Sequence, residues 1–597
     1  MTARPRRASM AGHSATALPM AQQPHPDPRT EARLAVQRTP GDAMAWILLS
    51  DIELQAGDAR NGAGAAQRAL QLAPGHPEAL ARLGRGLWML GRHADAVQAL
   101  RAAARNAPGH AGIAVWLGHA LEDAGEAEAA NDAYARAHAL APDHPQIAAY
   151  LLAWRRRLCD WRGIDALSRQ VRAAVASGDA AIEPFAFLSE DASAAEQLAC
   201  ARLRANAVAA QVRVLPPAPV RTSARLRVGF MSNGFGAHPT GLLTAAFFEA
   251  LRAHDAVDIH LFALNVDDGS IIRRRLQASA HALHEVADRP HAEIAGRIRE
   301  ADLDVLFDLR GWGGGGRPEV LAMRPAPLQV NWLAYPGTSG APWIDYVLAD
   351  RVVLPGELAA HHSEQPAWLP RCFQPSDTRR DVPPAPARAA CGLPETGTVF
   401  CCFNNSYKLN PASFARLMAV LRQVPGSVLW LLSGPGDADG RLREAARAGG
   451  IAADRLVFMP KQPQAAYLAR LQLADLFLDC NPYNAHTTAS DALWAGCPVL
   501  TRPGATFAAR VAASLNHHLG MDDLNVDDDA AFVALATALG NDPARLAALR
   551  QRVVALRDTP GLFDMTGFAR DFARIVAAMV ARQRRGEAPG PLSPGPG

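Results

Sequence analysis

This chain has very little lysine and no large excess of charge of either sign. Only two lysines, Lys408 and Lys461, stand among 61 basic residues, and 58 acidic residues leave a formal net charge of +3. Because the arginines are spread out and balanced by acids, the composition gives no basic surface for a nucleic-acid partner. A lysine in this chain therefore indicates a position that needs a compact ammonium, since an ammonium and a planar guanidinium are not interchangeable.

Long apolar runs are missing as well. No uncharged apolar stretch reaches about 18 residues, and the N-terminal segment MTARPRRASMAGHSATALPM lacks the apolar centre of a secretory signal. The eight cysteines form no CxxC pair and no metal-ligand spacing. We therefore expect buried, reduced thiols in a cytoplasmic protein with no membrane partner and no bound metal.

What the chain does contain is an internal repeat. Pro40, Pro74, Pro108 and Pro142 follow one another at intervals of 34 residues, each after an alanine-rich stretch. Thirty-four residues is the tetratricopeptide period, in which a pair of helices forms each unit. Small residues at equivalent places, such as Gly84, allow the two helices to approach closely. The repeat predicts an α-solenoid, whose concave face usually binds protein or peptide.

After a proline-rich segment the texture changes to short apolar strands that alternate with helical stretches. This alternation predicts βαβ units and parallel sheets. The expected strands are Leu226–Met231, Ile259–Ala263, Val305–Leu309, Val330–Leu333, Val399–Phe403, Val428–Leu432, Leu456–Phe458, Leu476–Asp479 and Val499–Thr501. A second proline-rich stretch near 374–389 divides them, so we expect two Rossmann-like α/β lobes with ligands at the carboxyl ends of the strands.

These boundaries define the expected organisation of the chain. It comprises disordered residues 1–28, a tetratricopeptide-repeat and helical arm over 29–213, a linker over 214–223, a first lobe over 224–385, a second lobe over 386–585 and a disordered tail over 586–597.

One segment of the second lobe has the pattern of a phosphate site. Residues 473–500 read LADLFLDCNPYNAHTTASDALWAGCPVL, in which a strand ends at Asp479 and a helix opens at His486, Thr487 and Thr488. Hydroxyls and free N–H groups at a helix start can bind a diphosphate. Thr488 with Asp491 three residues later also fits a capping box, so capping alone is the competing interpretation.

Three further strand ends carry candidate groups. Residues 400–408 read FCCFNNSYK and place Lys408 where its charge can stabilise a departing nucleoside diphosphate. Residues 227–241 read RVGFMSNGFGAHPTG and place His238 where an imidazole can accept a proton from a hydroxyl, although a lone histidine is more often structural. The loop at 332–340 reads WLAYPGTSG, and Gly337 and Gly340 allow it to approach a ligand closely.

Together these segments resemble the protein O-GlcNAc transferase family, in its bacterial form. The likeness is carried, in the family's order, by LRVGFMSNGFGAHPT, RPAPLQVNWLAYPGTSGA, FNNSYK, VPGSVLWLL, LADLFLDCNPYNAHTTASDALWAGCPV and RVAAS. It implies a GT-B fold and an inverting transfer of N-acetylglucosamine from UDP-GlcNAc to Ser or Thr hydroxyls of proteins that the repeats hold. It also implies that no metal and no cofactor beyond the UDP-sugar substrate is required.

The resemblance implies roles for individual residues. The diphosphate is expected at Lys408 and at the helix start, the ribose near Asp491, and the acceptor near His238, a candidate base. The expected catalytic residues are His238 and Lys408; the expected donor-binding residues are Asn405, Gln462, Gln464, Tyr467, Arg470, His486, Thr487, Thr488 and Asp491; the expected acceptor-side loop residues are Pro239, Thr240, Pro336, Gly337 and Thr338.

The chain also departs from the family. The stretch between the lobes is too short for the insertion that the animal enzymes carry there. Gln464 stands where the family has a lysine and Tyr467 where it has a histidine, so we expect weaker UDP binding. Arg82 and Trp116 stand at two positions of the family's asparagine ladder, which puts peptide binding in that mode in doubt.

Two alternatives to protein glycosylation stay open at this point. One is a non-catalytic interaction protein whose lobes survive as a UDP-binding scaffold. The other is a GT-B enzyme that acts on a glycan or on a sugar nucleotide. Turnover of a UDP-sugar would exclude the first, and sugar on a protein side chain would exclude the second.

Overall fold

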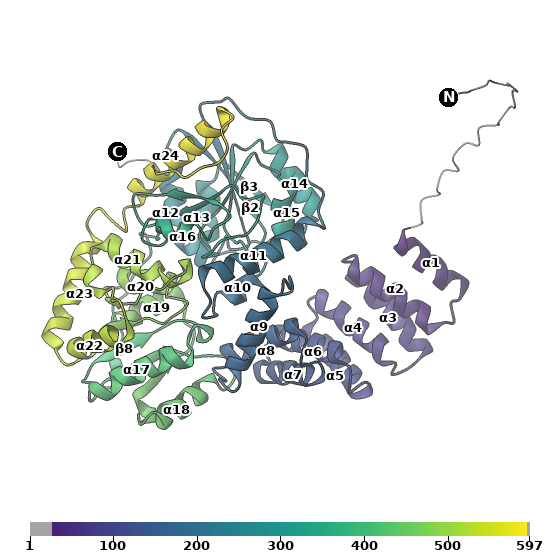
Figure 1. Cartoon of the computed structure of the whole chain (residues 1–597), viewed down its shortest axis with the longest axis horizontal. Coiled ribbons are helices and arrows are strands. Elements are labelled where there is room, and N and C mark those ends of the chain that lie inside the picture. The colour runs from purple at the N-terminus through teal and green to yellow at the C-terminus, as the bar shows by residue number, and fades with distance from the viewer. Residues whose placement is uncertain (1–26, 594–597) are drawn as a thin grey trace, which may run out of the picture. The chain divides into compact units, whose positions relative to one another are not determined.

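The chain divides into two units, residues 1–125 and residues 126–597, in a computed structural model that describes residues 27–593. The helices of the first unit are α1 (Pro28–Arg38), α2 (Ala43–Gln55), α3 (Ala59–Leu72), α4 (Pro77–Met89), α5 (His93–Asn106) and α6 (Ala111–Asp123) (Figure 1). Most of the segment 1–28 that we predicted to be disordered lies outside the described residues. Its last two residues differ from the prediction, because Asp27 caps α1 and Pro28 begins it.

Small residues let the helices of the first unit pack closely. A β-carbon on Gly84 of α4 would lie 2.5 Å from the side chain of Leu100 in α5, and Ala96 is fully buried. Helices α3 and α5 end two residues before Pro74 and Pro108, because the residue before a proline avoids helical geometry. The predicted repeat of helix pairs is confirmed in this unit.

The second unit begins with helices and not with a lobe. These helices are α7 (Ala127–Leu140), α8 (Pro145–Arg157), α9 (Ile164–Ala176), α10 (Pro184–Phe187) and α11 (Ala194–Ala209). We refer to residues 126–213 as the helical segment. The single arm predicted over 29–213 is therefore wrong as a structural unit, because its C-terminal half packs with the lobes.

Specific contacts hold the helical segment against the lobes. Arg441 of the second lobe pairs with Glu128 of α7 at 2.7 Å. The hydroxyl of Ser406 donates to the carbonyl of Arg157, at the end of α8, over 2.6 Å. The predicted linker 214–223 has no helix or strand but also lies against the first lobe, where the Leu215 amide donates to a carbonyl at 2.9 Å. It is therefore not a free linker.

The first lobe is built on a parallel sheet with the order β3-β2-β1-β4-β5-β6-β7. Its strands are β1 (Leu226–Ser232), β2 (Val257–Ala263), β3 (Ala282–Glu285), β4 (Val305–Asp308), β5 (Leu328–Asn331), β6 (Tyr346–Ala349) and β7 (Gln365–Trp368). Its helices are α12 (Pro239–Arg252), α13 (Ile271–Ser279), α14 (His291–Glu300), α15 (Pro318–Ala322) and α16 (Gly356–Ala359).

The second lobe repeats this plan with a parallel sheet in the order β10-β9-β8-β11-β12. Its strands are β8 (Val399–Cys402), β9 (Val428–Leu432), β10 (Leu456–Met459), β11 (Leu476–Leu478) and β12 (Val499–Leu500). The helices that follow β8 in the chain are α17 (Pro411–Gln423), α18 (Ala438–Ala448), α19 (Gln464–Leu471), α20 (Thr487–Trp494), α21 (Val511–Leu519), α22 (Asp529–Gly540), α23 (Pro543–Arg557) and α24 (Met565–Arg584). The predicted pair of Rossmann-like lobes is confirmed.

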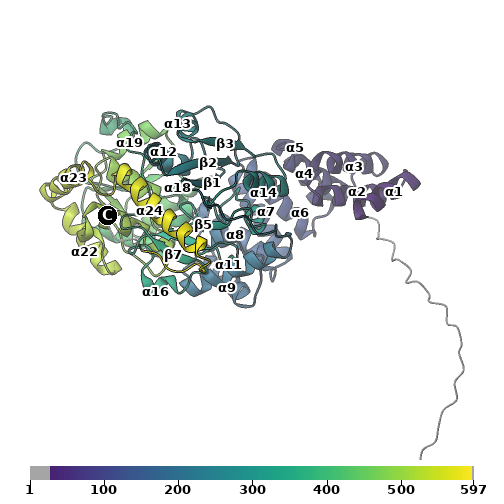
Figure 2. The ribbon, with the colours of Figure 1, turned by 90° about the horizontal axis from the view of Figure 1, so that it is seen from above.

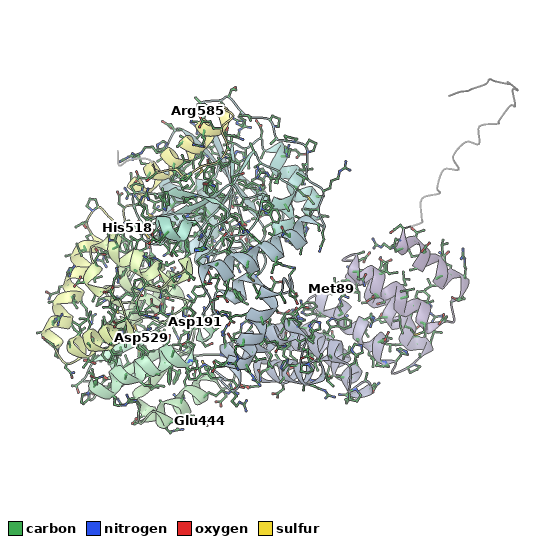
Figure 3. All side chains as sticks on the ribbon, in the orientation of Figure 1. Met89, Asp191, Glu444, His518, Asp529 and Arg585 are labelled. Carbon is green, nitrogen blue, oxygen red and sulfur yellow. The ribbon has the colours of Figure 1, made fainter. Side chains whose placement is uncertain are left out.

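The last helix does not belong to the second lobe. Figures 1 and 2 show α24 beside α12 of the first lobe, and in Figure 3 Arg585 marks its end there, whereas Asp529 marks the start of α22 in the second lobe. Phe568 and Phe572 of α24 pack on Phe247 with ring centroids 5.2 and 5.0 Å away. The predicted second lobe over 386–585 is therefore wrong at its end, because apolar residues of α24 complete the first-lobe core.

The predicted disorder of the tail 586–597 is also wrong over its described part. Leu592 pairs with Ala367 of β7, and its amide and carbonyl make backbone hydrogen bonds of 3.0 and 2.8 Å to that strand. The tail thus covers the free edge of β7, while residues 594–597 lie outside the described residues. Within residues 27–593 no helix is both long enough and apolar enough for a membrane crossing.

Candidate functional site

A cleft of about 780 Å³ lies where the carboxyl ends of strands from both sheets meet. This is the position at which ligands bind in doubly wound α/β folds, and the volume suits a nucleotide-sized ligand. Of the predicted site residues, those that line it are His238, Pro239, Thr240, Asn405, Lys408, Gln462, Gln464, Tyr467, His486, Thr487, Thr488 and Asp491. The sequence thus located one wall of the cleft on each lobe.

The start of α20 forms an anion-binding corner of the cleft. The helix begins at Thr487 without a side-chain cap, and Thr487 and Thr488 line the cleft, so the start of the helix is available to a ligand. His486 precedes it, and its Nε2 lies 3.0 Å from the Ala508 carbonyl. A carbonyl only accepts, so Nε2 carries the proton. Burial and Lys408 hold the pKa of His486 well below its usual range, and the ring is neutral.

A buried network fixes this corner. The Asp479 carboxylate, at the end of β11, accepts from the amides of Cys480 and Ala485 at 2.8 and 2.7 Å. Asn404 donates to the same carboxylate at 3.2 Å and accepts from the hydroxyl of Thr488 at 2.9 Å. The loop between β11 and α20 is therefore held in place before any ligand binds, which is how an active site is preorganised.

The predicted capping box at Thr488 and Asp491 is wrong. The Thr488 hydroxyl is used by Asn404, and the Asp491 carboxylate forms a buried ion pair with Arg380, from the segment that crosses between the lobes. Burial raises the pKa of Asp491, and Arg380 opposes that shift. Since the capping geometry is not formed, the interpretation that these residues only cap a helix loses its support.

Lys408 is buried beside this corner. The residue is 8% exposed, its ammonium donates to the Asn484 carbonyl at 2.7 Å, and the ammonium lies 3.8 Å from the ring centroid of Tyr483. Burial lowers the pKa of Lys408 from 10.5 to about 8. At neutral pH it is a poorly hydrated cation in a cleft, which is the state in which a charge acts most strongly on an anion.

His238 lies on the opposite wall, at the start of α12. Its Nδ1 accepts from the Thr240 amide at 3.2 Å and caps the helix. An amide only donates, so the neutral ring carries its proton on Nε2. Burial, followed by the charge of Arg310, lowers the pKa of His238 to about 4. This geometry makes His238 a hydrogen-bond donor rather than a strong base, which differs from the role expected from the sequence.

The predicted nucleoside wall is formed only in part. Gln464 begins α19 and lines the cleft, and Gln462 lines it while donating to the Pro460 carbonyl at 3.1 Å. Tyr467 lines it too, and its hydroxyl is buried without a hydrogen-bond partner. Arg470 is not among the lining residues, because its guanidinium turns back to the Ala466 carbonyl at 3.0 Å.

The predicted acceptor-side loop over Pro336, Gly337 and Thr338 does not line the cleft, whereas Leu333 and Ala334 just before it do. The Thr338 hydroxyl donates to the buried Glu364 at 2.6 Å. The loop glycines face the helical segment: a β-carbon on Gly340 would lie 2.4 Å from the backbone of α11. These glycines allow two segments of the chain to approach each other closely. The prediction that they allow the loop to approach a ligand is therefore wrong.

Several lining residues were missed. Arg310 follows the carboxyl end of β4, which is where ligands bind in such folds. Tyr407 lies inside the FCCFNNSYK segment. Phe185 comes from the helical segment, and nothing in the sequence placed it there. Gln374, in the segment between β7 and β8, is 3% exposed, and its amide nitrogen lacks a hydrogen-bond partner. An unsatisfied buried donor at a cleft wall is a group that a ligand can satisfy.

Two further predictions can be compared with the structure. All eight cysteines are free, and all but Cys391 are buried, as expected. In the first unit, Arg82 and Arg85 lie over the Trp116 ring at 5.5 and 5.6 Å, so Arg82 and Trp116, the two positions at which the resemblance led us to compare with asparagines, contact each other. Among residues 27–593 no group of three or more His, Cys, Asp or Glu is placed to hold a metal ion.

Comparisons with known proteins agree with this geometry. The model of glycosyl transferase family 41 matches residues 212–383 and 382–572. A lysine-to-methionine mutant of the O-GlcNAc transferase of Thermobaculum terrenum superposes with a TM-score of 0.66 at 25% identity, covering 91% of this chain and 98% of that one.

Curated relatives match over part of their length. One, from Arabidopsis thaliana, is named a probable UDP-N-acetylglucosamine–peptide N-acetylglucosaminyltransferase, SEC, and is 34% identical over 61% of this chain and 38% of its own. Another, the UDP-N-acetylglucosamine–peptide N-acetylglucosaminyltransferase of Caenorhabditis elegans, is 27% identical over 62% of this chain and 42% of its own. The chain thus spans about two fifths of these relatives. The family match covers most of both lobes and includes the cleft: the chain belongs to glycosyl transferase family 41.

Proposed function

We propose that the protein is an inverting protein O-glycosyltransferase that moves N-acetylglucosamine from UDP-GlcNAc to Ser or Thr hydroxyls. The observation that carries the proposal is the pairing of a buried, poorly hydrated Lys408 with the open start of α20 across one corner of the cleft. The family, and the activity printed in the names of the relatives, supply the sugar and the acceptor class.

In this proposal the diphosphate occupies the corner made by Lys408, Thr487 and Thr488. The acceptor oxygen attacks the anomeric carbon from the opposite side, the bond to the phosphate oxygen breaks, and its electron pair leaves with UDP. Lys408 and the helix start stabilise the negative charge that develops there, a role that preorganised donors perform without a metal. No metal and no cofactor is needed.

The acceptor enters on the side of His238. Because Nε2 of this ring carries the proton, His238 orients the acceptor or the sugar through a hydrogen bond. The proton of the acceptor hydroxyl passes to a phosphate oxygen of the departing UDP or to water. Repeats of the first unit contribute acceptor binding at a distance, which lowers the cost of placing a protein hydroxyl. The eight free thiols are typical of a reducing compartment, so we place the reaction in the cytoplasm.

A non-catalytic scaffold is the weaker explanation of the same cleft. Burying an ammonium costs stability, and a protein that only presents a surface has no use for that cost. Lys408 is buried although the chain uses arginine almost everywhere else.

The test is to incubate the protein with UDP-GlcNAc, UDP-glucose, UDP-galactose and GDP-fucose, with and without bacterial lysate, while following nucleotide release and label on protein. We expect UDP release from UDP-GlcNAc that rises with added acceptor, and label that is removed by β-elimination. No turnover of any donor would refute the enzyme, and label confined to glycans would refute the protein acceptor.

A further inference from the structure

A second pocket opens in the helical segment, next to the cleft. It has a volume of about 130 Å³ and is enclosed by α8, α9 and the segment 181–190 that contains α10. Phe185 and Tyr407 line both this pocket and the cleft. The two spaces therefore share a wall, and a chain that reaches the cleft on this side passes the mouth of the pocket.

Small apolar residues create this pocket. Ala149 and Ala153 lie one helical turn apart on α8 and face it together, and Ala181 and Ile182 line the other side. For comparison, a cavity of roughly 150 Å³ lined by Leu, Ile and Phe accommodates a benzene molecule. The pocket therefore has the size for one aliphatic side chain or one aromatic ring.

The charged groups around the pocket already have partners, and Arg157 among them lies over the Trp154 ring at 5.1 Å. Arg156 pairs with Glu190, which is 2% exposed and also accepts from the Ser168 hydroxyl. Glu183 lies 3.3 Å from Arg204. Because these charges are compensated within the protein, a charged ligand gains little here, whereas an apolar group gains by leaving water.

We propose that this pocket binds one apolar side chain of the acceptor polypeptide, close in sequence to the hydroxyl that receives the sugar. The inference rests on the proposed protein acceptor and deepens it, because it names a sequence preference. Continuity with the cleft through Phe185 and Tyr407 favours the acceptor over a free small molecule. Burial of one such side chain should change kcat/KM by about tenfold to a hundredfold.

The experiment uses the full chain and peptides that contain one Ser and a single Leu placed at successive positions on either side of it. Wild type should prefer one or two Leu positions over the all-polar peptide by at least about tenfold in kcat/KM. Ala153→Phe fills the pocket and should abolish that preference, while activity on the all-polar peptide, hydrolysis of UDP-GlcNAc and UDP binding stay unchanged.

Two further variants keep the test decisive. Ala149→Phe fills the same space from one turn away and should repeat the result if Ala153→Phe lowers the unfolding temperature. Ala166→Phe on the exposed side of α9 is the matched control and should behave as wild type. A Leu preference that survives both filling variants, or that Ala166→Phe also removes, would overturn the inference.

Failure of the proposed function is recognised separately. If peptides receive no sugar from any donor, the transfer proposal fails, and the pocket is then tested by fluorescence anisotropy of labelled peptides in the presence of UDP. Tighter binding of the Leu peptide to wild type than to Ala153→Phe would support the pocket. Equal binding, or displacement of neither peptide by excess unlabelled Leu peptide, would overturn it.

Discussion

Replacing Lys408 by methionine should separate catalysis from folding. Lys408 as a whole is 8% exposed and lies in the corner of the cleft assigned to the diphosphate. Removing one preorganised charge that acts on the leaving group should slow transfer by about a hundredfold or more, or about 3 kcal/mol of barrier. Binding of UDP should weaken much less, because the charge on the phosphate grows as the bond breaks.

The effect on stability follows from the pKa of Lys408, which is about 8 in the folded protein and 10.5 as the reference for the unfolded chain. Below pH 8 both states are protonated, so the folded state carries a cost of about 3 kcal/mol. Methionine removes that cost but leaves the Asn484 carbonyl unpaired and loses the contact with Tyr483, together about 2–4 kcal/mol. The unfolding free energy should therefore change by less than about 2 kcal/mol at pH 7.

The assay compares initial rates of transfer and thermal unfolding for wild type, Lys408→Met and Lys461→Met. Lys461 is exposed and is the chain's only other lysine, so it is the matched control and should retain wild-type rates. Wild-type turnover in Lys408→Met would remove this lysine from the mechanism. Loss of the folded state would show that Lys408 serves the structure and would refute the separation.

Other predictions concern pH, His238, metals and the nucleotide. The kcat/KM should fall as pH rises through about 8, because the pKa of Lys408 has been lowered to that value and the ammonium is lost; a rate that is flat to pH 10 would contradict this. His238→Asn, which can still cap α12, should lose turnover as His238→Ala does while UDP affinity stays within about threefold; recovery in the Asn variant would mean that only the cap matters. Activity should survive EDTA, and loss that Mg²⁺ or Mn²⁺ restores would refute a metal-independent reaction. Calorimetry should show UDP bound over GDP and CDP but only weakly, and Gln464→Lys should strengthen UDP binding by about tenfold; exclusive GDP binding would overturn the donor.

The sheets were the most predictable part of the fold. Strands buried on both faces read as continuous apolar runs, and all nine that we predicted are present within two residues at each end. Three strands were missed, and all are short: β3 reads ALHE at a sheet edge, β6 reads YVLA, and β7 contains Pro366. Their existence depends on neighbouring strands rather than on their own sequence.

The predictions that were wrong concern contacts between distant parts of the chain, which a local sequence pattern does not specify. Nothing in a local pattern tells that α24 returns to the first lobe, because an amphipathic helix only requires some apolar surface to cover. The glycines of the loop at 336–340 correctly indicate that another group approaches the loop closely. They do not indicate which group it is, and the structure shows that it is α11 rather than a ligand. Likewise Thr488 and Asp491 fit a capping box by spacing, while Asn404 and Arg380, distant in sequence, engage their side chains instead.

The helical segment contacts the loop that carries Lys408. Its α8 ends at Arg157, whose carbonyl holds the hydroxyl of Ser406, two residues before Lys408. The same segment supplies Phe185 to the cleft and the apolar pocket beside it. The pocket proposed for the acceptor and the lysine proposed for the leaving group therefore lie in neighbouring parts of one unit.

The central claim is that this cleft transfers N-acetylglucosamine to protein hydroxyls with Lys408 as its essential charge. Intact-mass spectrometry of acceptor proteins, purified after incubation with UDP-GlcNAc and either wild type or Lys408→Met, tests it most directly. We predict mass increments of whole N-acetylhexosamine residues on Ser or Thr with wild type and none above background with Lys408→Met. Unchanged acceptor masses with wild type while UDP is released, or equal modification by both proteins, would contradict it.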